Sequence, residues 1–286
     1  MADFQKQTVQ WFPGHMAKTR REIKESLPLV DAVVEIVDAR IPISSRNPEL
    51  DELTQSKPRI ILLNKFDLAD NGATKQWIEY YKSQGIAALA CNCKTGQNLN
   101  QFDNLVKEVL KDVIQNNIDK GMPGKALRLM VVGIPNTGKS TFINRMSGRN
   151  KLKTADIPGV TRMQQWIVCG NGIELLDTPG VLWPKFEDPA VGDKLAFIGS
   201  VKDEILDVET IAVRLLKILS EDYKERLEER YKIMVGDEEP YELLEKIGEA
   251  RGMKIKGGEI DTERAANTLL DEYRSGMLGR LTFERP

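Results

Sequence analysis

The sequence predicts an α/β domain with a mostly parallel sheet over residues 1–188, followed by an all-helical domain over residues 189–286. Apolar runs of strand length alternate with amphipathic helical patterns in the first part. Such runs stop near Pro189, and only helical periodicity continues beyond it. A chain of 286 residues is long enough for two domains of ordinary size.

The strands expected in the first domain are short aliphatic runs. They cover Ala32–Val37, Arg59–Leu63, Ile86–Ala90, Ala126–Val132, Gln165–Cys169 and Ile173–Leu176. Helical spacing of apolar residues predicts the helices between them. These helices cover Ala17–Leu27, Thr74–Gln84, Leu99–Asn116 and Lys139–Ser147. The first of them belongs to an N-terminal helical segment over residues 1–28.

The second domain shows apolar residues at helical intervals. The clearest stripe consists of Val208, Ile211, Ala212, Leu215, Leu216 and Leu219. The same theme returns at Leu243, Leu244 and Ile247 and at Leu269, Leu270 and Tyr273. Leu182–Pro189 is the expected connection between the two domains.

Composition excludes several classes of protein. The 41 Lys and Arg residues against 43 Asp and Glu leave a net charge of −2, so binding to nucleic acid would require a local basic patch. The apolar runs fall far short of the roughly 20 residues that span a bilayer. We expect a cytoplasmic protein without a leader peptide, in which the three cysteines Cys91, Cys93 and Cys169 are reduced thiols.

A phosphate-binding loop is predicted at Gly133–Ser140, which has the sequence GIPNTGKS. It follows an apolar strand and opens a helix, so glycines and backbone N–H groups can cradle phosphate oxygens at the helix N-terminus. Lys139 is expected to reach the β and γ phosphates, and the Ser140 hydroxyl to bind Mg²⁺. The remaining expected contacts of this loop are Pro135, Asn136, Thr137, Gly138 and Thr141.

The tetrapeptide Asn64–Asp67, NKFD, indicates which base is bound. It directly follows an expected strand, at the edge of the sheet where ligands bind. The Asp67 carboxylate can accept hydrogen bonds from the ring N–H and exocyclic amine of guanine, whereas adenine has no such pair of donors. The Lys65 side chain can lie over the base, so the sequence favours a guanine nucleotide.

Asp177–Gly180, with the sequence DTPG, closes the last expected strand. At that position Asp177 would help to hold Mg²⁺, and the Gly180 N–H would meet the γ-phosphate. Thr161 lies between this motif and the phosphate loop. It is the candidate for a switch residue that covers Mg²⁺ when the γ-phosphate is present.

The motifs occur in an unusual order, because Asn64–Asp67 and the turn Asn92–Gly96 precede the phosphate loop. Four further segments also carry family motifs: Gln10–Lys18, Val37–Pro42, Ser44–Pro48 and Leu182–Asp188. Over nearly its whole length the chain resembles the circularly permuted ribosome-assembly GTPases. The resemblance implies a circularly permuted P-loop GTPase domain, with base contacts at Asn92, Cys93 and Lys94 made through backbone N–H groups.

Hydrolysis needs a special explanation in this sequence. Many GTPases place Gln after the DxxG motif to orient the attacking water, but this chain has Val181. The resemblance implies two substitutes, a K⁺ ion held beside the phosphates by Asn136 and the imidazole of His15, the only histidine in the chain. Taken alone, Asn136 could simply form a turn and His15 could be structural. The candidate catalytic residues are His15, Lys139, Thr161 and Gly180.

Local basic residues are candidates for RNA contacts. Lys18, Arg20, Arg21 and Lys24 lie on the first expected helix, and Lys254 and Lys256 lie beside Gly257–Gly258. A solvated helix face is the alternative for the first group. The resemblance implies a monomer that binds the large-subunit precursor, its rRNA and ribosomal proteins, and that leaves after GTP hydrolysis.

Two other functions remain open from the sequence. Val181 is compatible with an RNA-binding scaffold that uses GTP without hydrolysing it. A P-loop kinase has less support, because Asn64–Asp67 specifies guanine and no pocket for an acceptor substrate is recognisable.

Overall fold

The structure is a computed structural model that describes residues 16–148, 165–180, 188–201 and 207–286, with side chains from residue 20 onward. The described residues fall into two compact units. The GTPase unit, as we call it below for its sequence motifs, lies within Trp11–Lys185 and also includes Thr282–Pro286. The helical unit lies within Phe186–Leu281.

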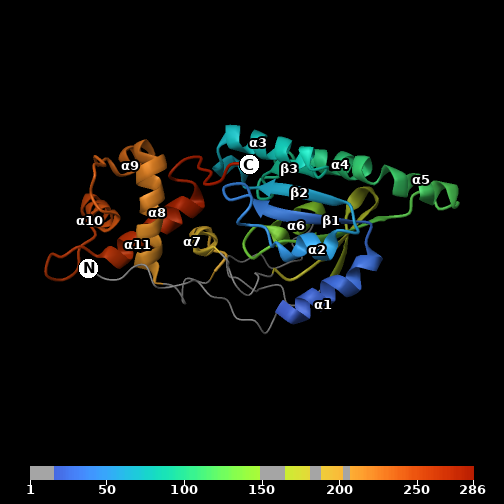
Figure 1. The fold of residues 1–286 in the computed structure, drawn as a ribbon, viewed down its shortest axis with the longest axis horizontal. Helices are drawn as coiled ribbons and strands as arrows, with labels where there is room; N and C mark the ends of the chain where they lie inside the picture. Colours follow the sequence, from blue (N-terminus) through green and yellow to red (C-terminus); the bar gives the residue numbers. More distant parts are fainter. Residues whose placement is uncertain (1–15, 149–164, 181–187, 202–206) are drawn as a thin grey trace. The chain divides into compact units, whose positions relative to one another are not determined.

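A six-stranded sheet forms the centre of the GTPase unit (Figure 1). Its strands are β1 (Ala32–Asp38), β2 (Arg59–Asn64), β3 (Ala87–Cys91), β4 (Leu127–Val132), β5 (Gln165–Val168) and β6 (Ile173–Asp177). They lie in the order β3-β2-β1-β4-β6-β5, and only the edge strand β5 runs antiparallel to its neighbour. All six strands expected from the sequence are confirmed.

The strand register places the motifs at one edge of the sheet. Asp38 at the end of β1 is aligned with Asn64 at the end of β2. Both β4, which leads into the phosphate loop, and β6, which ends at Asp177, run parallel to β1. The loops that follow these strands therefore emerge at the same carboxyl edge, where α/β sheets bind ligands.

Helices cover both faces of this sheet. They are α1 (Met16–Ser26), α2 (Glu49–Thr54), α3 (Asn71–Ser83), α4 (Phe102–Val109), α5 (Lys111–Asp119) and α6 (Lys139–Met146). Val34 and Ile36 of β1 share a buried cluster with residues of α4 and α6. Val33 packs with α1 and α2, and Val37 packs with α3. This alternation along β1 is the period of two that a strand with two covered faces requires.

Two details of the helices differ from the sequence prediction. The single helix expected over Leu99–Asn116 is interrupted at Leu110, where φ is −104° and ψ is 20°, so α4 and α5 are separate. The six-residue α2 was not expected. It is too short to show helical periodicity, and its position depends on packing of Leu50 against β1 and β4.

The helical unit is built around α8 (Val208–Asp222). The other described helices of this unit are α7 (Pro189–Phe197), α9 (Lys224–Tyr231), α10 (Pro240–Ala250) and α11 (Thr262–Ser275), and each contacts α8. Most of the predicted α8 stripe is buried, from Ile211 to Leu219, while Val208 is half-buried. No helix in the described parts of the chain is both long and apolar enough to cross a bilayer.

The last five residues do not group with the helical unit, although the sequence prediction placed all of residues 189–286 together. Thr282–Pro286 pack with the GTPase unit instead. The buried carboxylate of Glu284 accepts hydrogen bonds from the backbone N–H groups of Ile43 and Ser44. Such a contact between distant segments leaves no local pattern in the sequence.

Candidate functional site

The loop between β4 and α6 has the geometry of a phosphate-binding loop. Gly133 and Gly138 have φ values of 145° and 102°, which residues other than glycine rarely adopt. A Cβ atom on Gly133 would lie 2.5 Å from the carbonyl oxygen of Ile36, and one on Gly138 would collide with the side-chain amide of Asn64. Gly133 is therefore required by a close backbone approach and Gly138 by the Asn64 side chain, and both are also required by conformation.

Lys139 begins α6 and is buried. Its Nζ donates a hydrogen bond of 2.7 Å to the carbonyl oxygen of Ile134 within the same loop. Burial lowers the pKa of Lys139 to about 8, against the opposing attraction of Asp177. Gly180 lies beside the amine, because a Cβ atom added there would be 2.5 Å from Lys139 Nζ. The structure thus brings the ends of two separate motifs together at the phosphate loop.

The base-reading tetrapeptide contacts the phosphate loop directly. Asn64 Nδ2 donates to the carbonyl oxygen of Thr137 at 2.7 Å. Lys65, with a left-handed φ of 59°, donates from Nζ to the carbonyl oxygen of Asn136 at 2.9 Å. Asp67 Oδ1 is buried without a hydrogen-bond partner, as expected for an acceptor that awaits a ligand. The two motifs therefore meet in space despite their inverted order.

The turn Asn92–Gly96 also belongs to this site, but its donors are already engaged. The Cys93 N–H donates to Asn64 Oδ1, and the Lys94 N–H donates to Asn92 Oδ1, both at 2.9 Å. A base oxygen would have to share either N–H with these acceptors. The Asn92 side chain shapes the turn, since it also accepts from the Thr95 N–H. Cys91 and Cys93 are buried free thiols.

The residues present fit a Mg²⁺ ion. Both carboxylate oxygens of Asp177 are buried, and neither accepts a hydrogen bond of normal geometry. Burial raises the pKa of this group to about 6, despite the opposing charge of Lys139 and a contact with the Thr178 backbone N–H. Ser140 supplies a hydroxyl in the first turn of α6. Among the described residues, no cluster of three or more His, Cys, Asp or Glu side chains could hold a metal. This set suits Mg²⁺, which is usually bound by one or two protein groups together with phosphate oxygens and water.

Asp38 and Arg40 lie at this site but had no role in the sequence prediction, which named only the segment Val37–Pro42 that contains them. Asp38 is fully buried and accepts two hydrogen bonds from the Arg40 guanidinium, at 2.9 and 2.8 Å. It also forms an ion pair of 3.0 Å with Lys65 Nζ. Burial acts to raise the pKa of Asp38, but Arg40 and Lys65 outweigh it and hold the pKa well below its usual range. The signal available in the sequence was the place of Asp38 at a strand end.

Some predicted site residues lie outside the described residues. These are His15, Thr161 and Val181, and also the side chain of Lys18. On α1, Arg20, Arg21 and Lys24 are exposed. Arg20 pairs with Glu49 at 3.5 Å and Arg21 with Glu25 at 3.6 Å, which dilutes the local positive charge. Lys254 and Lys256 are exposed in the helical unit.

Known proteins are similar to this chain over most of their length. A family model described as 50S ribosome-binding GTPase matches residues 128–246. Ribosome biogenesis GTPase A of Priestia megaterium is 50% identical over 280 residues, which cover 98% of this chain and 97% of that protein. The chain belongs to the ribosome biogenesis GTPase A family. A member of this family from Thermotoga maritima is 34% identical over 279 residues, covering 97% of this chain and 95% of that protein.

Solved structures agree with this family assignment. The crystal structure of GNP-bound YlqF from T. maritima has a TM-score of 0.64 at 32% identity, and it covers 94% of this chain and 98% of that one. A GDP-bound YlqF structure gives a TM-score of 0.66 at 32% identity, with 93% and 99% covered. The predicted fold class of a permuted P-loop GTPase followed by a helical region is confirmed.

Proposed function

We propose that this protein is a cytoplasmic GTPase that assists maturation of the large ribosomal subunit. With GTP bound it docks on the precursor, and hydrolysis releases it. The observation that carries the proposal is the contact of Asn64 and Lys65 with the phosphate loop, which builds one guanine nucleotide site from two motifs. The names of the relatives, ribosome biogenesis GTPase A, support the ribosomal role.

Nucleotide recognition follows from the groups that face this site. The unpartnered Asp67 Oδ1 accepts hydrogen bonds from guanine. The aliphatic part of Lys65 covers the base, while Asp38 and the Asn136 carbonyl oxygen hold the Lys65 amine. The phosphates bind at the N-terminus of α6, where backbone N–H groups have no partner within the helix. Their negative charge draws Lys139 Nζ away from Ile134 and keeps it protonated, which offsets the lowering of its pKa by burial.

Hydrolysis is slow in the isolated protein and is accelerated by the ribosomal particle. Ser140, Asp177 and Thr161 would hold Mg²⁺, which would supply positive charge to the phosphate oxygens. The Gly180 N–H would meet the γ-phosphate, Asn136 would hold a K⁺ ion that adds positive charge, and His15 would position the attacking water. Val181 has no side-chain polar atom and cannot replace the usual Gln.

The ribosomal contacts consist of rRNA phosphates and ribosomal proteins. Lys18, Arg20, Arg21 and Lys24 supply one basic surface, and Lys254 and Lys256 supply another. The protein acts as a monomer in this proposal. A GTP-binding RNA scaffold that does not hydrolyse is the second candidate, and the observation that favours it is Val181.

The deciding experiment measures phosphate release from GTP with and without purified large ribosomal subunits, in K⁺ and again in Na⁺. We expect the subunits to raise turnover in K⁺ by about tenfold or more, as partner-supplied groups do in other GTPases. His15→Ala should lose this stimulation and keep its affinity for GDP. Lys24→Ala is the control in the N-terminal part of the chain, and it should weaken subunit binding without changing turnover at saturating subunits. GTP-dependent binding without phosphate release would instead establish the scaffold.

A further inference from the structure

The segment Thr282–Glu284 returns from the helical unit to the GTPase unit. Leu281 is the last residue grouped with the helical unit, so the segment is also a covalent link between the two units. Thr282 and Glu284 are only 2% and 8% exposed. A segment buried this deeply has specific partners, which lie on the loop between β1 and α2 and on the segment from Asp70 into α3.

The first contact region is the loop Ala39–Pro48, which directly follows Asp38. The Phe283 N–H donates to the carbonyl oxygen of Arg40 at 2.9 Å. The Glu284 carboxylate accepts from the Ile43 N–H at 2.7 Å, from the Ser44 N–H at 3.1 Å and from the Ser44 hydroxyl. A charged acceptor with three donors is a strong anchor, because charge-assisted hydrogen bonds exceed neutral ones in strength.

The second contact lies just beyond Asp67, at the start of α3. The Asp70 N–H donates to Thr282 Oγ1 at 3.0 Å. Asp70 also caps α3, since its side chain accepts from the Ala73 N–H at 2.7 Å. The indole N–H of Trp77 on α3 donates to the Glu284 carbonyl oxygen at 3.1 Å. The segment thus contacts both the loop that follows Asp38 and the start of α3, just beyond the base-reading residues.

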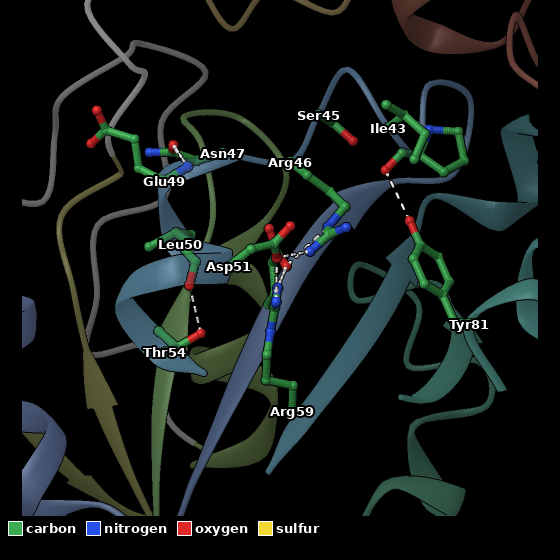
Figure 2. A network of polar contacts seen from close by, with 12 residues as sticks. Ile43, Ser45, Arg46, Asn47, Glu49, Leu50, Asp51, Thr54, Arg59 and Tyr81 are labelled. Atoms are coloured by element: carbon green, nitrogen blue, oxygen red, sulfur yellow. Dashed lines mark hydrogen bonds and ion pairs between the residues drawn. The ribbon is translucent and has the colours of Figure 1, made fainter. Parts of the chain in front are cut away.

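The Ala39–Pro48 loop is itself held by side-chain contacts, so a contact on this loop affects the position of Asp38. The Tyr81 hydroxyl donates to the Pro42 carbonyl oxygen at 3.2 Å. Figure 2 shows Arg46 and Arg59 both reaching the carboxylate of Asp51. Arg46 Nε donates to Glu35 at 3.2 Å. The Asp38 N–H donates to Ser45 Oγ at 2.9 Å. Asp38 in turn binds Lys65, which covers the base.

We infer that Thr282–Glu284 is a positioning element of the guanine site: it holds the Asp38–Lys65 ion pair on one side and Asp70 beside Asp67 on the other, and so raises affinity for guanine nucleotides. The inference rests on the guanine site proposed above. Linkage is reciprocal, so a bound guanine nucleotide also strengthens the attachment of this segment.

The test is GDP affinity, measured with a fluorescent GDP analogue and unlabelled GDP as competitor. Glu284→Gln should weaken binding by about three- to tenfold, the size of coupling expected for neighbouring groups. Glu272→Gln is the matched control, because Glu272 is a buried carboxylate paired with Arg230 and Arg251 inside the helical unit. It should leave GDP affinity unchanged at a temperature where both variants are folded. Thr282→Val, which keeps the side-chain shape, provides the same test if Glu284→Gln does not fold.

A merely structural role is separated from positioning by two further readouts. In a Lys65→Met background, Glu284→Gln should have less than half of its effect on GDP affinity, because the same path is already broken. GDP should also slow amide hydrogen exchange at Phe283 in the unmodified protein. The inference is overturned if Glu284→Gln and Glu272→Gln bind GDP equally well, or if GDP does not change amide exchange at Phe283. Either result leaves the proposed function standing. No GDP binding by the unmodified protein overturns both.

Discussion

Replacing Asp177 by Asn should stabilise the nucleotide-free protein at neutral pH and remove Mg²⁺-dependent nucleotide binding. In the absence of ligand this buried carboxylate accepts no hydrogen bond of normal geometry, and its nearby compensating groups are the Lys139 amine and the Thr178 backbone N–H. An ionised group in that environment has lost its hydration without full compensation. The site therefore trades stability for readiness to bind a cation, as functional sites often do.

The magnitude follows from the pKa of Asp177, which burial raises to about 6. Relative to an ordinary aspartate near 3.9, this corresponds to about 3 kcal/mol lost from the unfolding free energy when the folded form is ionised. Because the folded pKa is the higher one, the penalty is absent below about pH 4, grows from there to about pH 6 and is complete above it. The advantage of Asp177→Asn should follow the same course.

The assay is urea unfolding of both proteins from about pH 4 to about pH 7, with chelator and without nucleotide. The cost of burying the new amide does not vary with pH, so the change in the stability difference isolates the ionisation. A difference that is constant with pH, or that favours the unmodified protein increasingly as pH rises, would refute the reasoning. In a parallel titration, added Mg²⁺ should strengthen GTP binding by the unmodified protein only.

Two further substitutions test the base and phosphate loops. Asp67→Asn should move the binding preference from guanine to xanthine nucleotides by about 2 kcal/mol or more, because the amide donates where the carboxylate accepted. Competition between XTP and GTP measures this shift, and an unchanged preference for GTP would contradict it. Gly138→Ala should destabilise the protein by about 1–3 kcal/mol and abolish nucleotide binding, because its methyl group meets the Asn64 amide at a φ of 102°. Gly121→Ala, also at positive φ but with no atom within 4 Å, is the control and should retain GDP binding in the same calorimetric titration.

Local patterns in the chain were sufficient for much of the fold. The aliphatic runs became strands because each is bounded by turn residues and matches the length of a buried strand. The α8 stripe from Ile211 to Leu219 became the core of the helical unit, because period 3.6 presents one apolar face. The sequence prediction missed the break at Leu110, because the break does not disturb the helical spacing of apolar residues. It also missed α2, because a six-residue helix is too short to create such a pattern.

The sequence by itself determined the family of this protein, through the permuted order of its GTPase motifs, and it predicted a phosphate loop at Gly133–Ser140 and a guanine-reading Asn64–Asp67. These signals are local, because a motif needs its residues at fixed spacing along one segment. Only the tertiary structure decided how the segments support one another. Asn64 bonds to Thr137 across 73 positions, and Glu284 bonds to Ser44 across 240, and no local spacing encodes such contacts. They arise because parallel strands bring their loops to one edge of the sheet and a returning segment is buried beside that edge.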